Sequence, residues 1–276
     1  MRTEIVAYLG GVDDTEPILK LHGYVEGPIA GHARTMPHRV LLSPHGSTGG
    51  ALVATAELHE TCFWNPVPHW YEAHVTLGSG DEAVAETRRV VGVRPLSVTA
   101  EGLRLNGRPF VLRAVAADTL SDELLKLCLS ENSRLAVTSV SDDQLRRASE
   151  AGLPLIVTAC GSQDEVIAEL RRLARWPAVM VAVIEATGAV TAELRLECPN
   201  VLLAEAVTAD RPLADWAHLA VVDDDENATA PPTTAVLQRL RCPAADSLDE
   251  RIAVAGTFDT PQDGAAEHGH AVGCIV

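Results

Sequence analysis

The sequence predicts a β-sandwich of the immunoglobulin-like type followed by a compact (β/α)8 barrel. In residues 1–95, short runs alternate apolar and polar side chains, which is the pattern of half-buried strands. In residues 96–276, apolar runs alternate with segments of helical period, which is typical of parallel strands joined by helices. The pattern changes within residues 90–115, so we expect two domains, 1–95 and 96–276.

Composition excludes several classes of function. The 276 residues are enough for two domains with separate cores, and 22 Lys+Arg against 38 Asp+Glu leave a net charge of −16. We therefore expect neither nucleic acid nor a membrane surface as a partner, because both require a basic face. The start of the chain lacks the apolar run of a signal peptide, and no later run has transmembrane length, so we expect a cytoplasmic protein.

Six strands are expected in the first domain, separated by turns rich in Gly, Pro and Ser. Their short length and regular spacing favour a sandwich of the immunoglobulin type. The expected strands are 4–9, 18–25, 38–43, 51–58, 70–77 and 83–91.

A hairpin is expected at residues 103–113, where the pattern changes. Asn106-Gly107 is a strong signal for a type I′ turn, because both central positions of that turn need a positive φ. The residues before and after the pair alternate as strands do.

Eight strands alternating with helices are expected after the hairpin, with Ser141 capping one helix and Gly152 closing it. Eight such units predict a closed barrel, with an open doubly wound sheet as the competing fold. The expected strands are 111–115, 134–140, 153–160, 179–185, 201–207, 219–223, 252–256 and 271–276. The expected helices are 121–132, 141–151, 163–175, 191–197, 211–216, 233–241 and 264–268.

Three segments resemble glycoside hydrolase family 2, the family of β-galactosidases, β-glucuronidases and β-mannosidases. The hairpin LNGRPFVLRAV at 105–115 resembles the family's entry into the barrel, and Gly92-Val93-Arg94 stands at its GFR strand. The segment CFWNPVPHWY at 62–71 resembles a sandwich-edge loop, which we expect to be packed by its aromatic residues. WPAVMVAVIEAT at 176–187 resembles the fourth barrel strand.

The resemblance implies two catalytic carboxylates, an acid/base after strand four and a nucleophile after strand seven. Here the first position falls on Ala186-Thr187 and the second falls near Gly256, so neither holds a carboxylate. The polar family residues after strands one, two and three are also absent. We therefore predict a degenerate, non-catalytic relative that acts as a carbohydrate-binding or interaction scaffold, together with another protein subunit or alone.

An active glycosidase with relocated carboxylates is the alternative. The candidates are Glu185, Glu205, Asp223 and Asp259, each near the end of an expected strand. For Glu185 and Glu205 we favour a polar plug hydrogen-bonded inside the barrel.

No cofactor or metal site is predicted. The six cysteines contain no CxxC pair, which argues against a zinc site or a disulfide framework and favours buried free thiols. The acidic run at 223–226 offers oxygen ligands without the spacing of a known calcium loop, which leaves cation binding there open. His268-Gly-His270 has no ligand partner nearby in sequence and reads as a surface loop.

Overall fold

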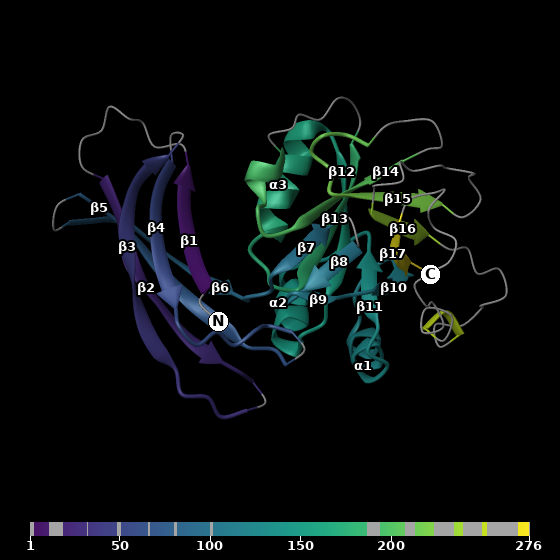
Figure 1. Ribbon diagram of the computed structural model, residues 1–276, viewed down its shortest axis with the longest axis horizontal. Helices are drawn as coiled ribbons and strands as arrows, with labels where there is room; N and C mark the ends of the chain where they lie inside the picture. The colour runs from purple at the N-terminus through teal and green to yellow at the C-terminus, as the bar shows by residue number, and fades with distance from the viewer. Residues whose placement is uncertain are drawn as a thin grey trace. The chain divides into compact units, whose positions relative to one another are not determined.

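The computed structural model describes residues 3–10, 19–31, 33–48, 51–65, 67–79, 82–99, 102–186, 194–207, 213–223, 235–239, 250–252 and 270–275. The chain divides into two compact units, Met1–Val93 and Arg94–Val276 (Figure 1). None of the described helices is long and apolar enough to cross a membrane.

The first unit is an antiparallel sheet with the strand order β1-β4-β3-β2-β5-β6. Each expected strand is present at its place in the sequence, and most of them are longer than expected. The strands are β1 (Thr3–Gly10), β2 (Leu19–Ile29), β3 (His38–Thr48), β4 (Ala51–Leu58), β5 (Trp70–Ser79) and β6 (Glu82–Val91).

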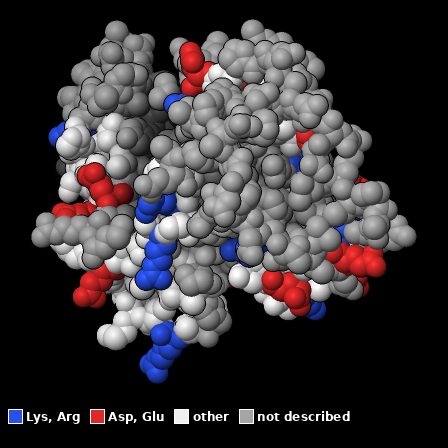
Figure 2. Space-filling view, turned by 45° about the vertical axis from the view of Figure 1, so that its right-hand side comes forward, with Lys and Arg blue, Asp and Glu red and all other residues white. Residues whose placement is uncertain are grey.

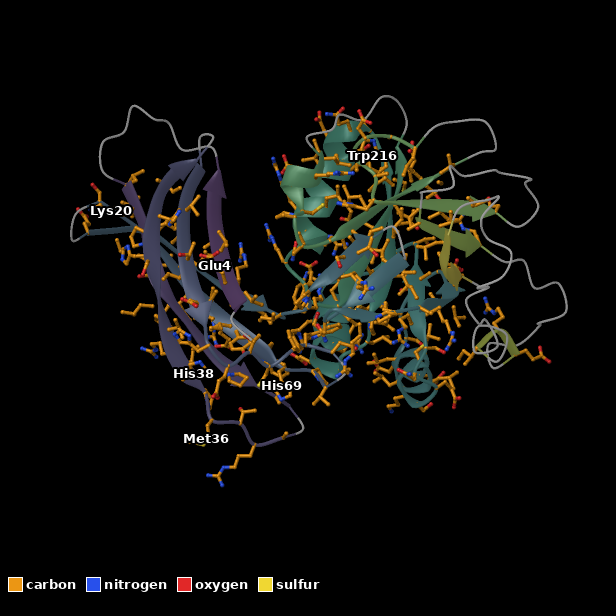
Figure 3. The ribbon with its side chains drawn as sticks, viewed as in Figure 1. Glu4, Lys20, Met36, His38, His69 and Trp216 are labelled. Atoms are coloured by element: carbon orange, nitrogen blue, oxygen red, sulfur yellow. The ribbon has the colours of Figure 1, made fainter. Side chains whose placement is uncertain are left out.

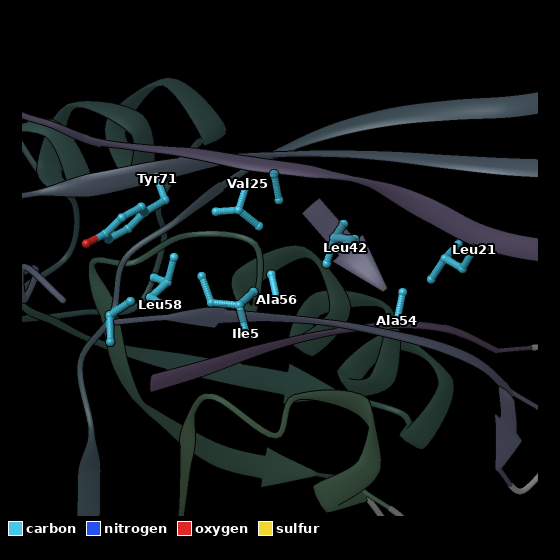
Figure 4. Close-up of a cluster of buried hydrophobic side chains, with 10 residues drawn as sticks. Ile5, Leu21, Val25, Leu42, Ala54, Ala56, Leu58 and Tyr71 are labelled. Atoms are coloured by element: carbon cyan, nitrogen blue, oxygen red, sulfur yellow. The ribbon is translucent and has the colours of Figure 1, made fainter. Parts of the chain in front are cut away.

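Strand β3 joins the two halves of this sheet. Its first half pairs with β2, from His38 to Leu42, and its second half pairs with β4, from Ser43 onward. Apolar side chains from both halves, among them Ile5, Val25 and Leu58, pack into one core (Figure 4). One continuous strand therefore links the two halves around a shared interior.

The aromatic loop before β5 is a packing element, as predicted. Trp64 is fully buried, and its backbone N–H donates to the carbonyl oxygen of Val93 at 2.8 Å. The buried Tyr71 hydroxyl accepts from the N–H of Cys62 at 2.9 Å. Burial raises the pKa of Tyr71, which keeps this hydroxyl neutral.

The second unit begins with the predicted hairpin, in a small sheet of β7 (Leu96–Thr99), β8 (Gly102–Leu105) and β9 (Arg108–Pro109). Asn106 and Gly107 have φ values of 54° and 77°, as a type I′ turn requires. The N–H of Asn106 donates to the carbonyl oxygen of Pro95, which ties the turn to the chain that enters the unit.

Eight parallel strands then form a closed barrel in sequence order. The last strand pairs with the first, through Leu112–Gly273 and its neighbours, so the competing open sheet is wrong. The strands are β10 (Leu112–Ala117), β11 (Arg134–Val137), β12 (Leu155–Gly161), β13 (Val179–Ala186), β14 (Leu202–Ala206), β15 (Leu219–Asp223), β16 (Ala235–Arg239) and β17 (His270–Ile275).

Four described helices connect the first strands of the barrel. Helix α2 begins with a capping box between Ser141 and Gln144 and ends at Gly152 with φ 78°, as its sequence predicts. Helix α3 has the same kind of capping box, between Ser162 and Glu165. The helices are α1 (Asp122–Ser130), α2 (Asp142–Ala151), α3 (Gln163–Leu173) and α4 (Leu194–Glu197).

The seventh strand corrects the sequence analysis. Residues 233–241 were expected to form a helix, but Ala235–Arg239 is strand β16, which pairs with β15 and β17. The expected seventh strand at 252–256 is wrong at its start, since 250–252 are helical. A segment this short, with three apolar residues, fits either period, and the pairing with its two neighbouring strands makes it a strand. The expected helix at 264–268 lies outside the described residues.

Candidate functional site

Three charged side chains meet at the carboxyl ends of the barrel strands. Arg239 ends β16, and its Nη2 atom lies 3.5 Å from Oε1 of Glu185 on β13. Its Nη1 atom lies 3.5 Å from Oδ1 of Asp223 on β15. The carboxyl end is where parallel barrels place their binding groups. We call Glu185, Asp223 and Arg239 the mouth cluster.

These side chains turn toward the barrel axis. In the barrel, β13 and β16 are separated by β14 and β15, so Glu185 and Arg239 reach each other only across the barrel opening. Asp223 is the register partner of Arg239 and faces the same way, because neighbours in register share a face of the sheet. All three remain accessible, with side-chain exposures of 44% for Glu185, 41% for Asp223 and 37% for Arg239.

Cys160 belongs to the same rim of the barrel. It is the register partner of Glu185 and therefore faces the same side of the sheet. Its thiol is free and exposed, unlike the buried thiols of Cys128 and Cys198. Burial raises the pKa of Cys128 to about 11 and that of Cys198 to about 12. The expectation of buried thiols is thus correct for those two and wrong for Cys160.

Glu205 faces away from the mouth cluster. Its register partners are Ile184, one residue before Glu185, and Ala220, three residues before Asp223. An odd separation along a strand places a side chain on the other face. Ala220 packs with Val222 and Val236 on that opposite side. The buried Glu205 carboxylate accepts from the backbone N–H of Ala214 at 2.7 Å. Glu205 therefore holds the connection between β14 and β15 on the outer side, where a plug inside the barrel had been expected.

Arg195 and His218 also hold the connection between β14 and β15. Arg195 on α4 donates from Nε to the carbonyl oxygen of Trp216 at 2.8 Å and from Nη2 to that of Ala217 at 2.7 Å. Trp216 is labelled in Figure 3. His218 accepts from the N–H of Leu203 through Nδ1 at 3.0 Å. Burial and the nearby Arg195 lower the pKa of His218. These contacts set where β15 begins and therefore where Asp223 lies.

The other candidates from the sequence fall in parts of the chain that are not described. Asp259, residues 224–226 and His268 lie outside the described residues. Within the part of the chain that is described, no group of three His, Cys, Asp or Glu residues has the arrangement of a metal site. On the face shown in Figure 2, acidic and basic side chains of the described residues are interspersed.

Arg239 is the member of the site that sequence reasoning missed. The sequence pattern predicts a helix over 233–241 and places the end of strand seven near Gly256 instead. A usable signal was present, since Thr233, Thr234 and Val236 are β-branched residues that favour a strand. With β16 as the seventh strand, a cation stands at its carboxyl end.

The mouth cluster can bind a polar, uncharged ligand. Its carboxylates accept hydrogen bonds, its guanidinium donates them, and the two contacts of 3.5 Å are too long to saturate either group. Hydroxyl groups can both donate and accept, so they suit this combination.

Comparisons with known proteins agree on the fold. No protein-family model matches the chain, and no curated protein matches it in sequence. It is similar in structure to a glycosyl hydrolase family 2 member from Bacteroides cellulosilyticus, with TM-score 0.60, 13% identity, and 99% of this chain and 43% of that chain covered.

Two further solved structures are β-glucuronidases, each covering 99% of this chain. The Bacteroides uniformis enzyme has TM-score 0.57, 14% identity and 43% of its own chain covered. The Bifidobacterium dentium enzyme, complexed with coumarin-3-O-glucuronide, has TM-score 0.57, 11% identity and 56% of its own chain covered. The chain spans about half the length of these structures. Its fold is therefore that of glycoside hydrolase family 2 proteins over this span.

Proposed function

We propose that this chain is a family 2-like protein that binds carbohydrate at the barrel mouth without hydrolysing it. The position of Arg239 between Glu185 and Asp223 is the observation behind this proposal. A glycosidase holds the scissile bond between two carboxylates that are roughly 5–5.5 Å apart in retaining enzymes and about 6.5–9.5 Å apart in inverting ones. In this chain, the Arg239 guanidinium lies 3.5 Å from each of the two carboxylates and so stands between them.

The family positions support the same proposal. Aligned with the family's fourth strand, the catalytic pair falls on Ala186-Thr187, where no carboxylate stands. Glu185, two positions earlier, is displaced by about 6.6 Å along the strand and pairs with Arg239. We therefore infer that the family's acid/base is lost and that the barrel is degenerate at its catalytic positions.

The assignment of the two domains belongs to this proposal. We infer an immunoglobulin-like sandwich over residues 1–95, supported by the antiparallel strands and their shared core. We infer a compact (β/α)8 barrel over 96–276, supported by the eight closed strands and the helices between the first of them. A protein partner subunit and a cytoplasmic location stay predictions.

An active glycosidase with relocated carboxylates is the second candidate. One observation favours it, because Glu185 and Asp223 lie on different strands and still reach the same cation. In that case Arg239 would have to move to admit the sugar.

The two candidate functions differ in whether the protein hydrolyses glycosides. The full chain is assayed on a panel of nitrophenyl glycosides, beside Glu185→Gln, Asp223→Asn and a control, Glu123→Gln, which changes an exposed carboxylate on α1. We expect no turnover from any of them. Turnover that is abolished by Glu185→Gln or Asp223→Asn but kept by the control would overturn the proposal in favour of the glycosidase.

Binding is measured on the same proteins by calorimetry with neutral mono- and oligosaccharides. We expect saturable heat with wild type and with Glu123→Gln, and a loss of about tenfold in affinity with Glu185→Gln, the scale of one or two hydrogen bonds to a charged group. A wild-type protein that neither binds nor turns over any sugar contradicts both candidates.

A further inference from the structure

Strand β6 is an exposed edge of the first unit. It is the last strand in the order β1-β4-β3-β2-β5-β6, and among the described strands it pairs only with β5. Every residue from Glu82 to Val90 is exposed, on both faces of the strand. An edge of this length presents a row of backbone N–H and C=O groups that a further strand can pair with.

The charges along β6 are divided by sign. Glu82 and Glu86 stand in its first half, and Arg88 and Arg89 stand in its second half. Charged side chains on an edge generally discourage pairing with unrelated strands. A strand with its two signs separated in this way is nevertheless complementary to its own antiparallel copy.

We propose that β6 pairs antiparallel with β6 of a second copy of this chain, about a two-fold axis at Thr87. In this register Glu86 of each copy lies opposite Arg88 of the other, which gives two cross-strand pairs of opposite charge. Val84 and Val90, which are 59% and 37% exposed, flank this stretch of the strand.

The neighbouring registers are unfavourable. Moving the axis by one residue, to Glu86 or Arg88, places two glutamates or two arginines directly opposite each other. Like charges in directly opposite positions destabilise a sheet. The charge pattern thus selects the register at Thr87 and also explains why a generic strand is a poorer partner.

Contacts within a single copy already position the charged side chains of this edge. Arg88 already forms an ion pair with Glu72 on β5, which holds its guanidinium over the outer face of the sheet. Glu86 forms no ion pair among the described residues, so its carboxylate is available to the second copy. The register shift opposite Leu77 and Gly78 leaves residue 84 as an extra residue, so β6 is regular from Ala85 to Val91. The part of this stretch that is symmetric about Thr87 is 85–89.

Sedimentation velocity on the full chain, at concentrations up to about 100 μM, tests the pairing. Glu86→Arg places an arginine at both 86 and 88, and Arg88→Glu places a glutamate at both. Each variant alone is expected to weaken self-association about tenfold or more, since two attractive pairs become repulsive. An equimolar mixture of the two variants is expected to dimerise again, because each edge then meets its complement.

Lys20→Glu is the control, because it replaces an exposed cation on β2 by a glutamate, as Arg88→Glu does on β6. It is expected to leave association unchanged. Circular dichroism verifies that all variants are folded. A wild type that stays monomeric over the whole range overturns the proposal. It is equally overturned by single variants that associate as wild type does, or by a mixture of folded variants that remains monomeric.

Discussion

Arg239 on β16 contacts Glu185 on β13 across the opening of the barrel, at 3.5 Å. With Asp223 on its other side, the guanidinium offsets part of the negative charge of two carboxylates. Both pairs are accessible to water, so they contribute little to stability, about 0–1 kcal/mol each. The role of Arg239 is therefore to hold the two carboxylates around one point, and its effect on stability is small.

Arg239→Gln is therefore expected to weaken sugar binding by about tenfold and to lower the free energy of unfolding by less than about 1 kcal/mol. Calorimetry and urea denaturation measure the two effects. Arg171→Gln is the matched control, because Arg171 pairs with Glu197 on the helical exterior. Equal losses of binding in both variants would place the ligand elsewhere.

His218 makes the barrel unit sensitive to acid. Its folded-state pKa is lowered from the ordinary value of 6.5, chiefly by burial and then by Arg195. The unfolded chain therefore binds a proton more readily, and stability falls as the pH drops from about 6.5 through the folded-state pKa. A protonated Nδ1 also cannot accept from the N–H of Leu203.

His218→Asn supplies an acceptor near Nδ1 that does not titrate. Urea denaturation from about pH 5 to about pH 8 is expected to show a steeper loss of stability on the acid side for wild type than for His218→Asn. Parallel curves for the two proteins would mean that His218 contributes nothing to the acid response.

Two glycines with positive φ differ in the space around them. A Cβ at Gly23 would lie 1.9 Å from the carbonyl oxygen of His74, while a Cβ at Gly107 would have nothing within 4 Å. Gly107→Ala is expected to cost about 1 kcal/mol, for backbone conformation alone. Gly23→Ala adds a backbone clash and is expected to cost about 3 kcal/mol or more. Thermal denaturation of both variants checks this order, and equal costs would contradict the close approach of β2 to β5.

Trp64 anchors the aromatic loop in the core of the first unit. It is fully buried, so Trp64→Ala is expected to destabilise that unit by about 3–5 kcal/mol through the cavity it leaves. Trp64→Phe keeps part of the ring and is expected to cost less. Tryptophan and tyrosine fluorescence during denaturation reports the transition, and a loss below about 1 kcal/mol for the alanine variant would contradict the packing role.

Local chemistry was enough to predict much of the fold. The turn at Asn106-Gly107 and the helix bounded by Ser141 and Gly152 depend on residues within a few positions of each other, and both occur as predicted. The strand at 235–239 was missed because its three apolar residues, Ala235 to Leu237, fit two periods. Such a segment becomes a strand only when neighbouring strands complete its backbone hydrogen bonds.

The sequence alone determined the order of an antiparallel part and a parallel strand-helix part, because alternation and capping are local properties of the chain. Only the tertiary structure decided which carboxylates meet. Glu185 and Asp223 reach Arg239 over the barrel mouth, while Glu205 faces the opposite side. The physical reason is register, since closing the barrel sets the phase of each strand against its neighbours, and one residue of phase turns a side chain to the other face.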